Sequence, residues 1–313
     1  MKLNKYNKEL KKITKLLESN SFSRQRIILT VLTISISLLA LAPLISLLAE
    51  GFNGLKEGSV SLGLDGINQV KGTIFLILFT SLFGGVLGTT NGWLLANTRF
   101  PGRKWLRIAQ LLPLATPSYL LAATLIDLGS IYSIRIYGMF WGVLIMTLTT
   151  YPYVFLLSTE SFSICGKRQL EASSIMGVGP WGSFRRVALP ITLPAIGAGI
   201  ALIGMEVVNE LGSVQLLNIP SISAGIVENW VANGNPAGAV ALAIIGLAIV
   251  MSLVAYERSL RNKSRRWVED IGEGQSLSWE LNGIRAFSAQ IISFLPPAFT
   301  LGIPIAWAIE NLE

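Results

Sequence analysis

The sequence predicts an all-α protein, a polytopic membrane helix bundle of about seven transmembrane helices. Three observations predict this class: the composition, the length of the apolar segments and the placement of the positive charges. Of the 313 residues, 51% are hydrophobic and 14% are charged, whereas soluble domains average about 25% charged residues. The mean hydropathy is +0.57. Domain counts that hold for soluble chains of this length therefore do not apply.

Crossing a bilayer as a helix takes about 20 consecutive, mostly apolar residues. Seven segments meet this requirement, and we expect each to be helical because a helix satisfies its own backbone hydrogen bonds in lipid. They are Ile27–Ala49, Gly72–Ala96, Ile108–Gly129, Gly138–Ser158, Ile191–Leu211, Gly238–Tyr256 and Ala286–Ala308. Pro113 and Pro117 interrupt the third segment, which is consistent either with a broken helix that lines a path or with an ordinary tolerated kink.

The basic residues predict the orientation. With a cytoplasmic N-terminus, the inside segments hold 22 of the 25 Lys and Arg residues. These segments are 1–26, 97–107, 159–190 and 257–285. The outside segments hold only Lys56, Lys71 and Arg135. This asymmetry is what the positive-inside rule describes, so we interpret the net charge of +7 as a topology signal and expect no nucleic-acid partner.

The domain organisation follows from the same pattern. Residues 1–26 alternate Lys with Leu and Ile, which is typical either of a basic amphipathic helix on membrane lipid or of a frayed basic tail. Residues 27–258 form the transmembrane domain, with a cytoplasmic loop at 160–190. The polar segment 259–285 is interpreted as a cytoplasmic linker, and 286–313 as the first helix of a second, incomplete unit.

The residue inventory excludes several chemistries. There is no His and only one Cys, which excludes a disulfide framework, a zinc site and His-based acid–base catalysis. No G-x-x-x-x-G-K-[ST] phosphate-binding loop occurs. We therefore predict no catalytic residue, no cofactor and no metal ligand in this chain. An intramembrane enzyme that uses Glu206 and Glu210 as acid and base is the competing class, but no nucleophile or metal constellation supports it.

The stretch EASSIMGVGPWGSFRRVALPITLP lies between the fourth and fifth predicted spans. Gln169–Met176 favours a helix, and Gly177 breaks it. Pro180–Val187 predicts a second short helix with proline in its first turn. Pro190 and Pro194 are expected to interrupt the start of the next span. The result is a compact knob of two short helices that leaves the membrane.

This stretch resembles the EAA loop of ABC-importer permeases, whose pattern is E-A-A, three residues, G, nine residues and I-x-L-P. The matching positions are Glu171, Ala172, Ser173, Gly177, Val187, Leu189 and Pro190. Ser173 and Val187 depart mildly from the pattern. The resemblance implies the fold of a type I ABC-importer permease. It also implies that the knob docks on a separate ATPase subunit, which binds the ATP and is present in two copies. An ordinary cytoplasmic hairpin is the alternative.

Phe100–Ala122 and Met205–Ile226 resemble the ferric-iron permease group. That resemblance implies a multi-pass protein of the bacterial inner membrane that moves ferric iron delivered by a periplasmic binding protein. Permeases for spermidine/putrescine, thiamine, sulfate or molybdate share the general layout, so these substrates are the alternatives to ferric iron. The ferric group is often a fused double permease, so this chain resembles its N-terminal half. It would then need a second permease half or a homodimer partner, unless it is a non-transporting truncated half-permease.

Three polar residues interrupt the fifth span: Glu206, Asn209 and Glu210. Residues 206 and 210 are four apart and share one helix face. Ionisable groups at that depth usually face a cavity or the bundle interior, so we predict that the three line the translocation path. An interhelical hydrogen-bond network is the alternative. Elsewhere, Gly84 and Gly88 predict close helix packing, and Trp93 is interpreted as a membrane-interface residue.

Overall fold

The computed structural model describes residues 26–43, 45–47, 49, 52–53, 63–164, 173, 175–268 and 278–311. The chain divides into two compact units, Met1–Val60 and Ser61–Glu313. In the first unit, the helix Arg26–Leu47 is long and apolar enough to span a membrane, as predicted. The amphipathic segment predicted before it lies outside the described residues, apart from Arg26.

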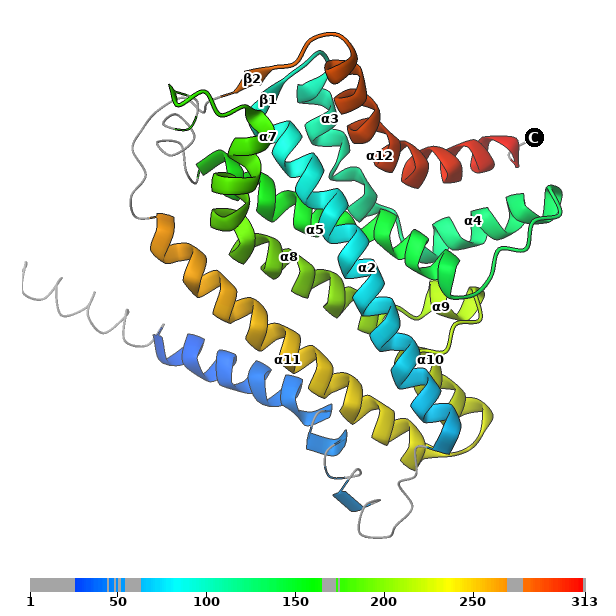
Figure 1. Cartoon of the computed structure of the whole chain (residues 1–313). Coiled ribbons are helices and arrows are strands. Elements are labelled where there is room, and N and C mark those ends of the chain that lie inside the picture. The colour runs from blue at the N-terminus through cyan, green and yellow to red at the C-terminus, as the bar shows by residue number, and fades with distance from the viewer. Residues whose placement is uncertain are drawn as a thin grey trace, which may run out of the picture. The chain divides into compact units, whose positions relative to one another are not determined.

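The second unit contains helices joined by short turns and one two-stranded ladder (Figure 1). In chain order the α-helices are α2 (Gly63–Asn97), α3 (Arg103–Ala109), α4 (Ser118–Ile131), α5 (Met139–Ile164), α7 (Pro180–Ser183), α8 (Leu189–Asn209), α9 (Gly212–Leu216), α10 (Ile222–Val227), α11 (Pro236–Val268) and α12 (Ile284–Glu310). The 3-10 helix η1 is Leu112–Ala115, and the π-helices are η2 (Phe184–Ala188) and η3 (Glu228–Ala232). The strands are β1 (Thr98–Arg99) and β2 (Trp279–Glu280).

The described part of the chain has six helices long and apolar enough to cross a membrane, or seven if one bent pair counts as a span. The bent pair is Arg103–Ala115 with Ser118–Ile131, the third predicted span. The all-α membrane bundle is therefore confirmed. Most helix ends differ from the prediction by a few residues, and α2 and α11 are longer because polar residues extend each helix beyond its apolar core.

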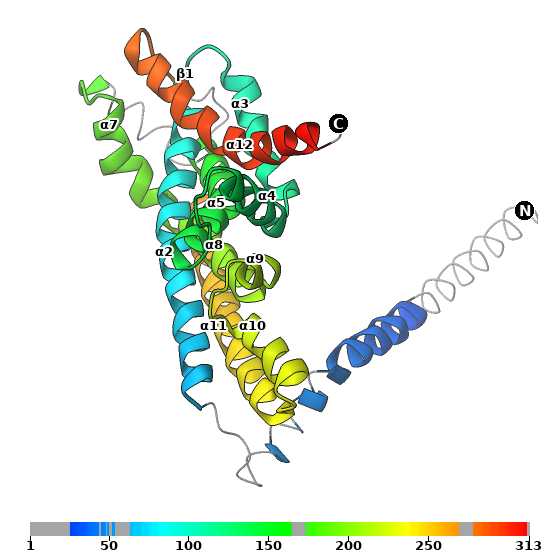
Figure 2. The same cartoon turned by 90° about the vertical axis from the view of Figure 1, so that its right-hand side faces the viewer.

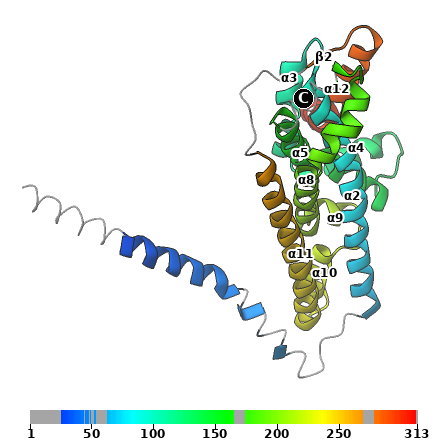
Figure 3. The same ribbon diagram turned by 60° about the vertical axis from the view of Figure 1, so that its left-hand side comes forward.

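The centre of the second unit is formed by α2, α5, α8 and α11, which run side by side (Figures 1 and 3). Glycines allow these backbones to approach closely. A Cβ at Gly88 would lie 2.7 Å from the Tyr151 carbonyl oxygen, and one at Gly199 would lie 2.7 Å from the Cα of Val154. A Cβ at Gly84 would lie 2.8 Å from the Ile203 side chain. The predicted small-residue packing is confirmed.

The last helix, α12, packs against α3, α4 and α5 within this unit. β2 pairs in parallel with β1, placing Trp279 beside Thr98 and Glu280 beside Arg99. Figure 2 shows β1, α3 and α12 at one end of the unit and α10 at the other. The predicted linker begins as helix, because α11 continues to Val268.

Prolines explain two of the hydrogen bonds that join α12 to distant segments. Pro152 lies inside α5 and has no N–H, so it leaves the carbonyl of Leu148 without its helical donor. The Thr300 hydroxyl of α12 donates to that carbonyl at 3.2 Å. Pro297 similarly frees the carbonyl of Ser293, and the amide of Gln110 donates to it.

Candidate functional site

The described part of the predicted knob is a glycine turn between two helical segments. Gly177 has a φ of 75°, the left-handed conformation that glycine adopts without strain. The Val178 N–H donates to the Ser173 carbonyl at 3.0 Å, which is the long bond of a Schellman helix end. Gly179 then caps the next helix, and Pro180 occupies its first turn, as predicted. Glu171 and Ala172 lie outside the described residues.

Ser173, which stands where the EAA pattern has alanine, is buried against the second helical segment. Its side chain is 3% exposed, and its hydroxyl is 2.8 Å from the hydroxyl of Ser183. Ser183 is fully buried and also donates to the Val178 carbonyl at 3.4 Å. The extra oxygen at position 173 is thus compensated by a hydrogen bond, because a buried hydroxyl needs a partner.

The prediction that Pro190 and Pro194 interrupt the start of the fifth span is wrong. Pro180–Asn209 forms one continuous membrane-length helix that passes through both prolines. Pro190 lies in the first turn of α8, and the π-helical turn η2 precedes it, with the Leu189 N–H bonded to the Phe184 carbonyl. This wider turn lets the chain accommodate a proline without ending the helix.

The surface of the knob is apolar at its tip and buried at its base. Ile175, Met176 and Trp181 are exposed by 87%, 74% and 65%. Val187 and Leu189 instead pack inward against the aromatic residues at the base, while Pro190 is exposed. The matched positions therefore divide between the turn and the base, and the tip presents bulky apolar side chains.

An aromatic cluster connects the knob to the bundle. Phe184 of η2 lies 5.2 Å from Trp93 of α2 and 5.2 Å from Trp181, measured between ring centroids. Trp93 also contacts Phe162 at 5.4 Å and Trp279 of β2 at 5.6 Å. The interpretation of Trp93 as a membrane-interface residue is wrong, because its side chain is only 5% exposed and packs inside this cluster.

The third predicted span is broken at its centre. Its two halves, Arg103–Ala115 and Ser118–Ile131, meet at an angle of 88°, and the 3-10 helix η1 with Pro113 ends the first half. Pro117 caps α4 with an extended backbone. Non-helical backbone at membrane depth is tolerated where it is covered by protein or lines a cavity. A cavity of about 190 Å³ lies at this break and is lined by Pro113, Thr116 and Pro117.

Both predicted carboxylates line the cavity at the break. Glu206 lies on α8 and accepts a hydrogen bond from the Tyr153 hydroxyl at 3.5 Å. Glu210 also lines it, although α8 ends at Asn209 and Glu210 has an extended backbone. Its carboxylate accepts from the Ser213 N–H at 2.8 Å. The expected shared helix face is therefore wrong at Glu210, because the helix ends first.

Asn209 differs from Glu206 and Glu210 in its contacts. Its side chain is exposed and donates back to the Met205 carbonyl of its own helix at 3.0 Å, and it does not line this cavity. The remaining polar lining comes from the hydroxyl-bearing side chains of Thr116, Ser118, Tyr119, Thr149 and Thr150. No Lys or Arg lines the cavity, so its described wall carries negative charge only.

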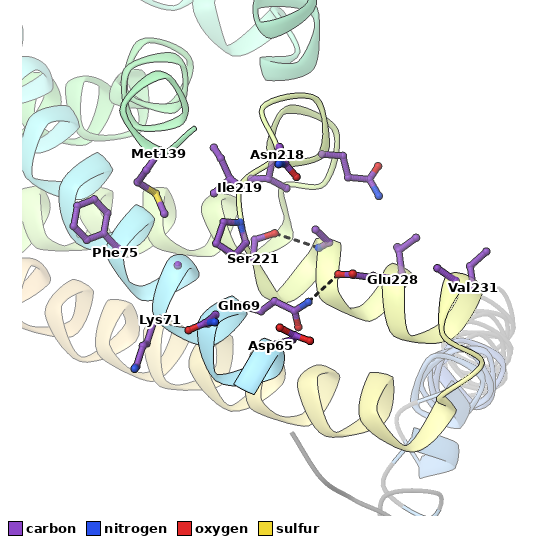
Figure 4. Close-up of a pocket in the computed structure, with 18 residues that line it drawn as sticks. Asp65, Gln69, Lys71, Phe75, Met139, Asn218, Ile219, Ser221, Glu228 and Val231 are labelled. Carbon is purple, nitrogen blue, oxygen red and sulfur yellow. Dashed lines mark hydrogen bonds between the residues drawn. The ribbon is translucent and has the colours of Figure 1, made fainter. Parts of the chain in front are cut away.

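Figure 4 shows a larger pocket, of about 1150 Å³, that sequence reasoning missed. It lies between the start of α2 and the α9–α10 region and is open at the protein surface; we call it the outer pocket. The Gln69 amide donates to Glu228 at 3.1 Å across its floor, and Asp65 and Lys71 supply further charge. No motif predicts it, because its residues come from segments about 150 positions apart along the chain.

Glycine fixes the wall of this outer pocket. A Cβ at Gly72 would lie 2.0 Å from the Pro220 carbonyl oxygen, so only glycine lets the loop before α10 rest on α2. The Ile222 N–H then donates to the Thr73 hydroxyl at 2.8 Å. Ser221 caps α10 by accepting from the Ala224 N–H. The adjacent Gly72 and Thr73 are the available sequence signal, and neither residue type alone indicates a pocket.

The bundle, the knob and the broken span with its carboxylate cavity are the features of a multi-pass membrane protein. Residues 88–266 match the family described as the inner membrane component of binding-protein-dependent transport systems. The match covers more than half of the chain, and the chain belongs to this family. Its members serve as transport components and not as enzymes.

Curated relatives carry two different substrates in their names. An Fe(3+)-transport system permease protein, FbpB 2, of Haemophilus influenzae is 29% identical over 195 residues, which cover 62% of this chain and 38% of the relative. A sulfate transport system permease protein, CysT, of Escherichia coli is 31% identical over 155 residues, which cover 46% of this chain and 56% of the relative. The chain thus spans less than two thirds of the length of these relatives.

Solved structures show the same fold at low sequence identity. A bacterial alginate ABC transporter in complex with an alginate pentasaccharide-bound periplasmic protein matches with a TM-score of 0.58 at 14% identity. That match covers 81% of this chain and 99% of the other. A second crystal structure, of a bacterial ABC transporter involved in alginate import, matches with a TM-score of 0.56 at 15% identity. These likenesses support the permease fold alone.

Proposed function

We propose that this chain is the membrane-spanning permease subunit of an ABC importer for ferric iron. A periplasmic binding protein delivers the substrate, and a separate ATPase subunit drives transport. The observation that carries the choice of substrate is the cavity at the broken third span, which Glu206 and Glu210 line and no described cation does.

The sign of this charge favours a metal cation over an oxyanion. Two unit charges about 4 Å apart interact by about 4 kcal/mol near a protein surface. Each carboxylate attracts a ferric ion with this strength for each of its three positive charges, and it repels a sulfate dianion with this strength for each of its two negative charges. Sulfate is the second candidate, because the CysT relatives are as similar as the iron permease.

The lining of the cavity also suits the passage of a metal ion rather than its stable binding. Among the described residues, no group of three or more Asp, Glu or Cys side chains gathers closely enough to hold a metal ion. Two carboxylates and several hydroxyls therefore give a weak, transient site. Conduction needs binding that is favourable enough to admit an ion and weak enough to release it.

The knob is the proposed contact for the ATPase. Its exposed tip of Ile175, Met176 and Trp181 offers apolar area of the kind that dominates binding energy at interfaces. Glu171 and Ala172 precede this tip in the sequence. Phe184 and Trp93 connect the base to α2, so a push on the knob reaches the bundle through a packed contact.

The outer pocket is the proposed contact for the binding protein. It is open and mixed in charge, with Asp65, Lys71 and Glu228 in its lining. An exposed surface that carries charged residues is typical of transient protein contacts rather than of a buried ligand site. It lies at the opposite end of α2 from the knob (Figure 1). A second permease half, or a second copy of this chain, completes the pore in this proposal.

Uptake by cells that express the chain together with its transport partners tests the substrate. We expect ATP-dependent accumulation of radiolabelled ferric iron that is lost when Glu206→Gln and Glu210→Gln are combined. Glu310→Gln, which removes an exposed carboxylate at the end of α12, is the matched control and should transport normally. Normal iron uptake by the double variant, or uptake of labelled sulfate instead of iron, would overturn the proposal.

A further inference from the structure

We propose that the turn between α2 and α3 holds the phosphate of an anionic phospholipid headgroup. A hollow of about 590 Å³ lies here, lined by residues of one short segment. The lining residues are Arg99, Phe100, Gly102, Arg103, Lys104, Trp105 and Arg107. Four of these seven residues are cations. A turn does not require so many positive charges, and their number indicates an anionic ligand.

The turn geometry brings these cations together. Gly102 has a φ of 80°, and the Arg103 N–H donates to the Phe100 carbonyl at 3.3 Å. The chain therefore reverses between Arg99 and Lys104. A Cβ at Gly102 would meet no atom within 4 Å, so glycine is required here by the backbone conformation and not by space.

Arg103 has a structural role that separates it from the other three cations. Its guanidinium donates to the carbonyls of Leu95 and Ala96, both at 2.9 Å. These bonds satisfy the last turn of α2, which has no basic residue of its own. Two of its five donors are used in this way, and the side chain is only partly buried.

The other three cations are exposed. Within the described part of the chain, Arg99, Lys104 and Arg107 form no ion pair and no side-chain hydrogen bond. Glu280 stands opposite Arg99 in the β1–β2 ladder, yet the two side chains are not bridged. The segment thus keeps an excess of uncompensated positive charge around one hollow, at a cost in mutual repulsion that an anion removes.

The surroundings indicate a lipid rather than a free anion. Trp105 is 78% exposed and Ile108 is 59% exposed, and they lie three residues apart on one face of the same helical stretch. In a membrane protein such an exposed apolar face contacts acyl chains. The membrane-length helix ends at Asn97, so the hollow lies where hydrocarbon gives way to headgroups, the depth at which tryptophan is enriched.

Quenching of tryptophan fluorescence by lipids brominated on their acyl chains tests this site in the full chain reconstituted into vesicles. The Trp105 signal is obtained by difference from Trp105→Phe. We expect brominated phosphatidylglycerol to be preferred over brominated phosphatidylcholine, with each cation contributing about fivefold. The combined variant Arg99→Gln, Lys104→Gln and Arg107→Gln should reduce this preference to at most the contribution of Arg103, about fivefold. Arg103 still holds the turn in this variant, so the loss reports the missing charges and not a misfolded turn.

The matched control removes three exposed cations elsewhere: Arg185→Gln, Arg258→Gln and Arg285→Gln. It should keep the preference. Retained preference in the first variant, or equal loss in the control, would overturn the proposal. Millimolar inorganic phosphate should not displace the lipid beyond the effect of chloride at equal ionic strength. If it does, the hollow is a site for free anions and the assignment to lipid is wrong.

Discussion

Replacing Thr300 with valine tests how α12 is held against α5. The substitution keeps the shape of the side chain and removes the hydroxyl that donates to the Leu148 carbonyl at 3.2 Å. Hydrogen bonds between membrane helices contribute about 0.6 kcal/mol on average and up to about 1.7 kcal/mol. The single hydroxyl proton is shared with the Pro296 carbonyl at 2.8 Å, so we expect a loss near the middle of this range, about 1 kcal/mol.

A second substitution shows whether the proline is the cause. Pro152→Ala restores an N–H that can bond to the Leu148 carbonyl within α5. In the Pro152→Ala background, Thr300→Val should then leave the unfolding free energy almost unchanged. The coupling energy between the two substitutions is therefore expected to be close to the loss caused by Thr300→Val alone. The free energy of unfolding is measured by titration with sodium dodecyl sulfate in mixed micelles, followed by circular dichroism.

Thr124→Val is the matched control for this cycle. Thr124 is 1% exposed, and its hydroxyl bonds only to carbonyls of its own helix, at 2.9 and 3.0 Å. Its loss should therefore be smaller than that of Thr300→Val. If Thr300→Val costs the same in the natural chain and in the Pro152→Ala background, the reasoning is refuted, because the carbonyl would then not depend on the hydroxyl.

Three further predictions test the packing and the knob. Gly88→Ala should cost about 1–3 kcal/mol of unfolding free energy in the same titration, because its Cβ meets backbone atoms of α5, whereas Gly302→Ala meets nothing within 4 Å and should be neutral. Phe184→Ala leaves a cavity in the aromatic cluster and should lower the unfolding free energy by about 3–5 kcal/mol; a loss below about 1 kcal/mol would contradict the packing role of Phe184. Trp181→Ala should lower the unfolding free energy by no more than about 1.5 kcal/mol, the contribution of its stacking on Phe184, but it should weaken ATPase binding, measured by co-purification, by about 30-fold or more; unchanged binding would exclude the tip from the contact.

Much of the fold could be predicted because a membrane imposes simple rules. A span needs a long apolar run, and a helix is the only open structure that satisfies its backbone in lipid. These rules identify the helices α2, α5, α8, α11 and α12. They identify the third span as well, but not its bend, because hydropathy measures composition and not direction.

The errors have a common physical origin in contacts that residue type does not reveal. The sequence predicts Trp93 at a membrane interface, yet Phe162, Phe184 and Trp279 enclose it. It predicts that Pro190 breaks a helix, yet the π-helical turn before it accommodates the ring. In each case the residue type has an average preference, and the local packing and backbone geometry override it. The sequence alone gives only the average preference of each residue type, because it does not show which residues surround it.

The sequence predicts the candidate path for a reason that the structure refines. Ionisable residues inside an apolar segment are costly, so Glu206 and Glu210 stand out. The structure adds that α8 ends at Asn209 and that the third span breaks beside it. Each departure alone is an irregular helix, but both face one cavity. Natural sequences break local rules mainly where function requires it, and two independent breaks that meet at the same carboxylates are the strongest structural reason to look for the substrate there.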